Sequence, residues 1–293
     1  MRILVTGAGG LLGSAVVSLA SRRHEVYSTY NVHPSYSGTP VRLDLLNRNE
    51  ISREVRRIAP EAIVHLAALT DVDACERNKA LAESINHEAT RALSESAKEG
   101  GTFFLYVSTD YVFDGSKGMY KEDDPANPIN TYGMTKLKGE EAVRSSGGEF
   151  CIARGSVIYG PRPAAGKVNF ALWILERLRR RENANILVDQ YVSPTLSTSM
   201  AASLIEIVER RLTGVFHVSG AERVSRLNFA MALAKTFDLD PSVLRPIPMS
   251  EMKWLAKRPR DSSLDVRKAD RTLDSKPLSL GESLRRLKTE VGG

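Results

Sequence analysis

A tyrosine and a lysine four residues apart are the first side chains of this sequence whose types and spacing suit a chemical reaction. They are Tyr132 and Lys136, and on a helix this spacing places both side chains on one face. A free tyrosine has a pKa near ~10, and a nearby ammonium lowers that pKa by favouring the phenolate. We therefore expect Tyr132 to exchange a proton with a carbonyl oxygen, helped by Lys136.

Two hydroxyl side chains end an apolar run upstream of this pair. They are Ser108 and Thr109, and the run begins at Thr102. In a parallel α/β sheet, ligands bind at the carboxyl ends of strands, where a hydroxyl can donate a hydrogen bond to a substrate carbonyl. Because side chains alternate along a strand, only one of the two hydroxyls can face the substrate.

The first thirteen residues predict a phosphate-binding turn between a strand and a helix. Gly7, Gly10 and Gly13 would permit the tight turn, the approach of a pyrophosphate and the close packing of the helix on the sheet. Leu11 and Leu12 open the helix, whose free N–H groups and dipole favour an anion. With a strand before it and a helix after it, this turn predicts binding of NAD(H) or NADP(H), either of which exchanges a hydride with a carbonyl.

The end of the second strand bears on the choice between these two dinucleotides. NAD-binding proteins of this type place an acidic residue there to bind the ribose 2′-hydroxyl. Residues 28–33, which include Tyr30, contain no carboxylate, and a carboxylate would repel a 2′-phosphate. The sequence therefore favours NADP(H) over NAD(H), although this strand end contains no arginine either.

The elements that must position these residues alternate between strand and helix through the first half of the chain. Apolar runs such as 62–67 are typical of parallel strands that are covered on both faces. The alternation predicts an α/β fold with a doubly wound parallel sheet. Residues 1–155 would form a dinucleotide-binding Rossmann domain, and residues 156–293 a smaller substrate-binding region that is interleaved with the last strands of the sheet.

The predicted strands are Arg2–Thr6, Glu25–Thr29, Val41–Leu43, Ala62–Ala67, Thr102–Ser108, Phe150–Ala153 and Gly214–Val218. The predicted helices are Leu11–Ser21, Asn49–Ile58, Ala80–Lys98, Tyr132–Val143, Asn169–Arg180, Ser199–Arg211 and Leu227–Thr236.

Composition and charge exclude several classes of protein. The 293 residues are 42% hydrophobic, and no apolar run approaches the ~18 residues of a membrane span. The net charge is +6, but no aromatic residues interleave with the basic ones, so we discount nucleic acid and favour an anionic small molecule. Cys75 and Cys151 have no histidine at metal-ligand spacing, so no metal site is expected. The first residues lack a signal-peptide cleavage site, which predicts a cytoplasmic protein.

Longer motifs resemble one family of the extended short-chain dehydrogenase/reductase superfamily. Residues 108–115 read Ser-Thr-Asp-Tyr-Val-Phe-Asp-Gly, 120–128 hold Tyr-x-Glu-x-Asp-x-x-x-Pro, and 132–140 hold Tyr-Gly-x-Thr-Lys-x-x-Gly-Glu. Together with 70–76, 189–195 and 258–264, they resemble the dTDP-4-dehydrorhamnose reductase family over nearly the whole chain. The resemblance implies NADPH-dependent reduction of a nucleotide-linked 4-keto sugar, in which dTDP-4-dehydro-L-rhamnose becomes dTDP-L-rhamnose.

The resemblance also implies roles for individual residues. The catalytic residues would be Thr109, Tyr132 and Lys136. Besides the glycine turn and this pair on the helix, the cofactor would contact Tyr30, Asp44, Leu45, Ala67 and Ala68. The substrate would contact Ser108, Asp110, Tyr111, Asn169 and Arg258. Other interpretations stay open: a turn cap for Asp44, a buried tyrosine for Tyr111, a helix cap for Asn169 and a surface arginine for Arg258.

Other functions also stay open on the same fold. Val157 stands where the family usually carries a tryptophan that packs on the sugar. Residues 154–160 and the glycine turn also resemble the β subunit of methionine adenosyltransferase, an NADP-binding partner of another enzyme. An epimerase or dehydratase ranks third, because Tyr111 follows Asp110 where dehydratases carry a glutamate. A homodimer stays open as the oligomeric state.

Overall fold

A seven-stranded parallel sheet forms the centre of the computed structural model, which describes residues 1–31, 37–163 and 168–292. The strand order is β11-β6-β5-β4-β1-β2-β3, and every neighbouring pair is parallel. This order confirms the predicted doubly wound sheet, because the strands build outward from β1 in both directions. The strands are β1 (Arg2–Thr6), β2 (Glu25–Tyr30), β3 (Thr39–Arg42), β4 (Ala62–His65), β5 (Phe103–Thr109), β6 (Phe150–Gly155) and β11 (Gly214–His217).

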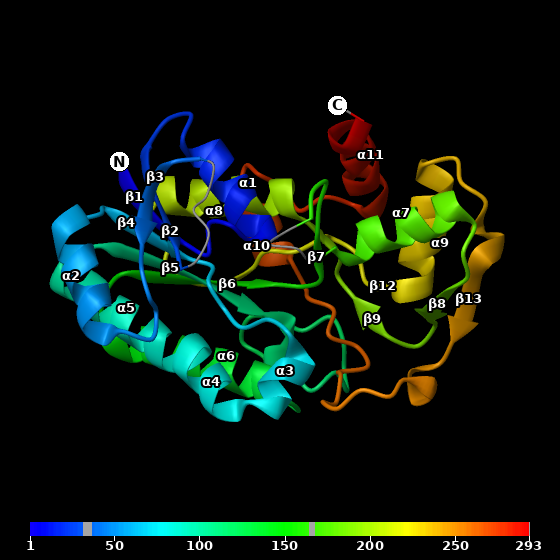
Figure 1. Cartoon of the computed structure of the whole chain (residues 1–293), viewed down its shortest axis with the longest axis horizontal. Helices are drawn as coiled ribbons and strands as arrows, with labels where there is room; N and C mark the ends of the chain where they lie inside the picture. Colours follow the sequence, from blue (N-terminus) through cyan, green and yellow to red (C-terminus); the bar gives the residue numbers. More distant parts are fainter. Residues whose placement is uncertain (32–36, 164–167, 293) are drawn as a thin grey trace.

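Helices cover both faces of this sheet (Figure 1). Successive side chains of a strand point to opposite faces, so Leu105 and Val107 pack toward one set of helices and Phe104 and Tyr106 toward the other. The first set is α1 (Leu11–Ala20), α8 (Ser197–Glu209) and α10 (Arg267–Thr272). The second set is α2 (Arg48–Ile58), α5 (Ala89–Glu99) and α6 (Thr131–Ser146). Within the described part of the chain, no helix is both long and apolar enough to cross a membrane.

A second apolar core lies beside the sheet and is built from the C-terminal half of the chain. Tyr159, Phe229 and Leu284 are among its buried members. The same half also gives β11, α8 and α10 to the first core, and the domain boundary at residue 155 stays a prediction. The elements around the second core are α7 (Phe170–Arg180), α9 (Arg226–Thr236), α11 (Leu280–Gly292) and the strand pairs β7 (Ile158–Tyr159) with β10 (Thr195–Leu196), β9 (Tyr191–Val192) with β12 (Val224–Ser225), and β8 (Ala184–Leu187) with β13 (Leu244–Ile247).

The single helix predicted over Ala80–Lys98 is interrupted in the structure. A short helix, α4 (Lys79–Glu83), passes into a π-helical turn (Ser84–Glu88) before α5 begins. In this turn the Asn86 side chain bonds to the backbone of Leu69 through both its oxygen and its nitrogen, at 2.8 and 3.1 Å. The sequence also missed the short helix α3 (Val72–Arg77). Apolar periodicity carries no signal for a one-turn π-helix, which long-range contacts stabilise.

Close backbone contacts shape the glycine turn after β1. Gly7 has φ +69°, and a Cβ there would lie 2.7 Å from the backbone nitrogen of Ala67. A Cβ on Gly13 would lie 2.1 Å from the carbonyl oxygen of Gly7, so only glycine lets α1 start this close to the turn. The backbone after β4 bends toward the same turn, where the Ala67 N–H donates to Thr6 Oγ1 at 3.3 Å. This bend ends β4 earlier than the sequence predicts.

Gly13→Ala should destabilise the protein, because the added methyl group meets the backbone of Gly7. We expect the free energy of unfolding to fall by about 2 kcal/mol, since overpacking outweighs the helix preference of alanine. Gly9→Ala is the matched control, because a Cβ on Gly9 meets nothing within 4 Å. Urea unfolding measures both variants, and equal stability of the two would contradict the packing argument.

Candidate active site

Three neighbouring strands end at the edge of the sheet where the predicted chemistry lies. The glycine turn follows β1, Ala67 and Ala68 follow β4, and Thr109 ends β5. These strands are adjacent in the order β5-β4-β1, and parallel strands end at a common edge. The turn and the predicted catalytic hydroxyl therefore share the edge where the direction of strand order reverses, which is the usual ligand site of such sheets.

The first turn of α6 brings Tyr132 to this edge. Asn130 caps the helix by accepting a hydrogen bond from the Gly133 N–H at 2.8 Å. A Cβ on Gly133 would lie 2.1 Å from the carbonyl oxygen of Tyr111, so this glycine allows the close approach of α6. Thr109 lies near Tyr132 and acts to lower the Tyr132 pKa. The structure thus joins the tyrosine and one of the two hydroxyls that the sequence singled out.

The pKa of Tyr132 shifts in the direction opposite to the sequence expectation. Burial raises it above the ordinary value of ~10, and the nearby Thr109 side chain offsets this only in part. Lys136 points to the sheet instead: its Nζ donates to the Val107 carbonyl at 2.8 Å and lies 4.1 Å from the centre of the Tyr106 ring. Because burial dominates, Tyr132 keeps its phenolic proton at neutral pH.

Lys136 is itself almost completely buried, with 3% of its surface exposed. Burial lowers its pKa to about 7, and Glu140, one turn further along α6, opposes this shift. Glu140 is paired with Arg154 of β6 at 2.7 Å, and nearby Ser108 helps to lower the pKa of that carboxylate. Ser108, a predicted substrate contact, therefore lies toward Glu140, whereas Thr109 faces Tyr132.

Asp110 is a buried carboxylate that joins three parts of the chain. Its Oδ1 accepts a hydrogen bond from Thr109 at 3.0 Å, and its Oδ2 accepts from Ser156 at 2.7 Å and from Ser262 at 2.6 Å. Asp110 is 2% exposed, and burial raises its pKa. The sequence expects Asp110 to contact substrate. With three hydroxyls on its oxygens, we propose that it orients Thr109 instead.

Tyr111 lines the site beside Tyr132. The two rings meet edge to face with their centres 5.9 Å apart. Tyr111 lies near Gln190, which acts to lower the Tyr111 pKa, and Gln190 Oε1 accepts a hydrogen bond from Arg226 Nε at 3.0 Å. Gln190 belongs to the family-like motif 189–195, which could have indicated it. Nothing in the sequence singles out Arg226, because it reaches the site through the pairing of β9 with β12.

The two remaining predicted substrate contacts are already engaged by other groups. Asn169 caps α7: its Oδ1 accepts from the Leu172 N–H at 3.3 Å, and its Nδ2 donates to the Gly160 carbonyl at 3.0 Å. This is the helix cap that the sequence left open. Arg258 is no surface arginine, because its side chain is 12% exposed and pairs with Asp73 at 3.1 Å. Substrate contact by either residue stays a proposal.

The ends of β2 and β3 form the predicted adenine side of the cofactor site. Asp44 and Leu45 follow β3, and Asp44 Oδ1 accepts from the Leu46 N–H at 2.9 Å, which is a turn cap. The register of the two strands pairs Tyr30 with Arg42. The sequence found no arginine at the end of β2, and the structure supplies one from the neighbouring strand. Residues 32 and 33 of that strand end lie outside the described residues.

Val157 has a backbone conformation that β-branched residues rarely adopt, with φ +39°. The Thr195 N–H donates to the Val157 carbonyl at 3.1 Å, and Thr195 Oγ1 donates to the Ser156 carbonyl at 2.6 Å. These bonds hold a conformation that costs on the order of 1–3 kcal/mol and that is typical of functional sites. The neighbouring Ser156 donates a hydrogen bond to Asp110 at 2.7 Å, which connects this strained segment to the site.

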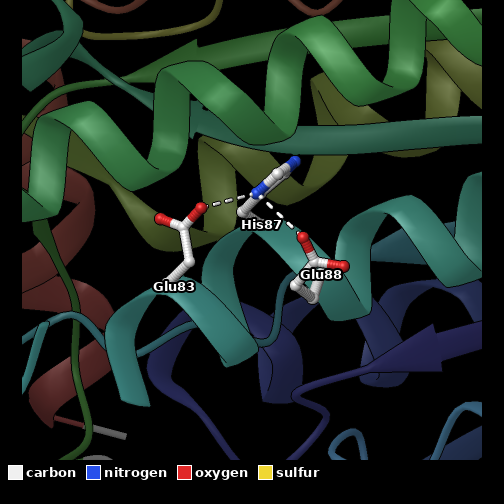
Figure 2. Close-up of side chains that lie close together, drawn as sticks. All are labelled: Glu83, His87 and Glu88. Atoms are coloured by element: carbon white, nitrogen blue, oxygen red, sulfur yellow. Dashed lines mark hydrogen bonds and ion pairs between the residues drawn. The ribbon is translucent and has the colours of Figure 1, made fainter. Parts of the chain in front are cut away.

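Glu83, His87 and Glu88 form one group of residues with metal-ligand chemistry (Figure 2). Their candidate ligand atoms lie within 4.8 Å of one another, and His87 Nδ1 lies 2.9 Å from Glu83 and 3.3 Å from Glu88. Lys138 pairs with Glu83 at 2.8 Å, and Arg91 pairs with Glu88. Because these cations neutralise both carboxylates, we assign no metal to the group, which the sequence did not predict.

Comparison with known proteins gives this arrangement a family. The family model described as "RmlD substrate binding domain" matches residues 1–291. The dTDP-4-dehydrorhamnose reductase of Burkholderia thailandensis is 34% identical over 90% of this chain and 90% of its own. Methionine adenosyltransferase 2 subunit beta of Bos taurus is 33% identical over 90% of this chain and 80% of its own.

A solved structure agrees over the whole chain. It is dTDP-4-dehydrorhamnose reductase from Bacillus anthracis in complex with NADP, which has a TM-score of 0.88, 28% sequence identity and 99% coverage of both chains. The family match, the curated relative and this structure all span nine-tenths of the chain or more. The chain therefore belongs to the dTDP-4-dehydrorhamnose reductase family, a family of NAD(P)H-dependent oxidoreductases.

Proposed function

We propose that this protein uses NADPH to reduce a nucleotide-linked 4-keto sugar, and that the reaction converts dTDP-4-dehydro-L-rhamnose to dTDP-L-rhamnose. The observation that carries the proposal is the nearness of Tyr132 and Thr109 at the sheet edge that also holds the glycine turn. This arrangement suits a carbonyl oxygen held by two hydroxyls beside a hydride donor. The name of the Burkholderia thailandensis relative supports the same substrate.

The glycine turn fits the pyrophosphate of a dinucleotide. A Cβ on Gly7, Gly10 or Gly13 would lie 2.7, 3.2 or 2.1 Å from backbone atoms, so the turn packs closely on itself and on the segment after β4. No side chain caps the free N–H groups of α1, which favours an anion there. When bound, NADPH supplies a hydride to the carbonyl carbon. We assign its contacts to Gly7, Gly10, Leu11, Leu12, Gly13, Tyr30, Asp44, Leu45, Ala67, Ala68, Tyr132 and Lys136.

The catalytic side chains divide the work on the carbonyl oxygen. Tyr132 gives this oxygen its proton, because its raised pKa keeps the phenol protonated at neutral pH. In the structure the Thr109 hydroxyl donates its hydrogen to Asp110 Oδ1, and on substrate binding this hydrogen turns to the carbonyl oxygen as a second hydrogen bond. We assign the cofactor ribose to Lys136, whose Nζ donates to the Val107 carbonyl and has further N–H groups for the ribose. Tyr111 and Arg258 contact the substrate, with Asn169 at the α7 side of the site.

Similarity to methionine adenosyltransferase 2 subunit beta supports a second candidate, a cofactor-binding partner of another enzyme. The buried catalytic group favours reduction over this role. A buried lysine such as Lys136 costs stability, and strongly shifted pKa values gather at sites that perform chemistry. The two functions differ in their need for the Tyr132 hydroxyl, which only the reductase requires.

Purified protein given NADPH and dTDP-4-dehydro-L-rhamnose is expected to oxidise NADPH, which is followed by the loss of its absorbance. Tyr132→Phe should lower kcat by about 10²-fold or more, because it removes the proton donor, while NADPH still binds. Tyr27→Phe is the control, since the Tyr27 hydroxyl bonds to Glu25, outside the site. If the protein binds NADPH but reduces neither this sugar nor related keto sugars, the reductase proposal fails.

Arg42 supports the preference for NADP(H) over NAD(H). Paired residues of neighbouring strands place their side chains on the same face, so Arg42 and Tyr30 lie side by side at the adenine end. Arg42 is exposed. A 2′-phosphate at this end would meet the guanidinium, whereas a 2′-hydroxyl would gain much less from it.

Arg42→Ala should raise the KM for NADPH by about 10-fold or more, because a hydrogen bond to a charged group contributes ~1.5–3 kcal/mol. The KM for NADH should stay unchanged. Arg48→Ala is the matched control, because Arg48 lies near this end but pairs with Glu95. Steady-state kinetics with both cofactors gives the answer, and an equal loss for NADPH and NADH would refute the assignment.

Lys136 should make stability depend on pH. Its pKa is about 7 in the folded chain and near ~10.4 in an unfolded one. Between these values the unfolded chain binds more protons, so the contribution of Lys136 to stability rises with pH over this interval. Lys136→Met removes that rise. The stability of the variant minus that of wild type should therefore fall by a few kcal/mol as the pH rises from about 7 to about 10.

Urea unfolding at several pH values measures this difference. Lys138→Met is the control, because Lys138 lies on the same helix with 42% of its side chain exposed. A stability difference between Lys136→Met and wild type that is constant across the interval would contradict the shifted lysine pKa.

A further inference from the structure

Arg226, the first residue of α9, is a partly buried cation with no ion pair to any described carboxylate. Its Nε donates to Gln190 at 3.0 Å, and its guanidinium carbon lies 4.8 Å from the centre of the Phe170 ring. Burial lowers its pKa. The carboxylate that acts on it from a distance is Asp110, whose oxygens are held by three hydroxyls. Such a charge is costly unless an anion completes it.

Two other arginines on the same side of the molecule lack this property. Arg223 pairs with Asp261 at 2.6 Å, and Arg258 pairs with Asp73 at 3.1 Å. Their charges are therefore balanced within the protein. Arg226 differs from both because its only described side-chain hydrogen bond goes to a neutral amide.

A short series of contacts connects Arg226 to the proposed catalytic tyrosine. Gln190, which is 3% exposed, accepts a hydrogen bond from Arg226 and lies near Tyr111. The ring of Tyr111 meets the ring of Tyr132 edge to face. Arg226 thus belongs to the substrate side of the site, and its strand pair β9–β12 lies outside the sheet that carries the glycine turn.

We propose that Arg226 binds the diphosphate of the nucleotide-linked substrate. The proposal rests on the proposed function and names the group that holds the nucleotide part of the substrate. Phe170 covers one face of the guanidinium, and Gln190 accepts the hydrogen bond from its Nε. The two terminal nitrogens are therefore left for phosphate oxygens. A planar guanidinium binds two such oxygens at once, and the anion balances the partly buried positive charge.

Binding of dTDP, measured by titration calorimetry with thymidine as the uncharged comparison, tests the proposal. Arg226→Met should weaken dTDP binding by about 10- to 100-fold, leave thymidine unaffected and leave NADPH affinity unchanged. Arg226→Lys, which keeps a point charge without the planar fork, should lose less. Lys235→Ala is the control, because it removes one positive charge from the other end of α9, ~14 Å away.

The outcomes separate this proposal from the proposed function. If wild-type protein binds no dTDP, both fall together. If wild type and Arg226→Met bind dTDP equally, the role of Arg226 falls alone and the reductase function stands. An equal loss of NADPH and dTDP binding in Arg226→Met would mean that this variant damages the fold, and Arg226→Lys then decides. If Arg226→Lys binds dTDP as tightly as wild type, the proposal is overturned. If Arg226→Lys weakens dTDP binding but not NADPH binding, the proposal is supported.

Discussion

One buried carboxylate holds together the segments that must act on the same substrate. Asp110 accepts hydrogen bonds from hydroxyls at the end of β5, in the segment after β6 and in the C-terminal segment. A buried acceptor that loses its donors costs about 1–3 kcal/mol, and more when it is charged. The three segments therefore reach their positions together. These hydrogen bonds orient Thr109, and they also connect the second core to the sheet.

The sheet could be predicted because its signal is local. A parallel strand covered on both faces is apolar at nearly every position, so β1 and β5 are visible in the sequence almost to the residue. The π-helical turn is invisible, because it depends on bonds from Asn86 to Leu69 and Thr135, which are distant in the chain. The two-residue strands of the second region are too short to show a period.

The site, like the fold, has features that local sequence patterns predict and features that they do not. The spacing of Tyr132 and Lys136 on one helix face predicted which residues could react, and alternation predicted that only one hydroxyl would join them. The direction of the Tyr132 pKa shift depends on burial beside residues from other elements, among them Cys75 and Asp110, and no local pattern reports burial. Arg226 comes next to Gln190 only because β9 and β12 pair in antiparallel register. Residue types were readable, and their electrostatic surroundings were not.

The strained backbone at Val157 has a consequence for how substrate choice evolves in this fold. Its left-handed conformation is held by the hydrogen bonds of Thr195 and by the hydrogen bond from Ser156 to Asp110, and not by the valine side chain. Any residue at this position therefore takes a backbone conformation that neighbouring segments determine. Under the proposed function, a bulky residue in place of this valine would change the shape available to the sugar, while the proton-transferring hydroxyls stay where they are.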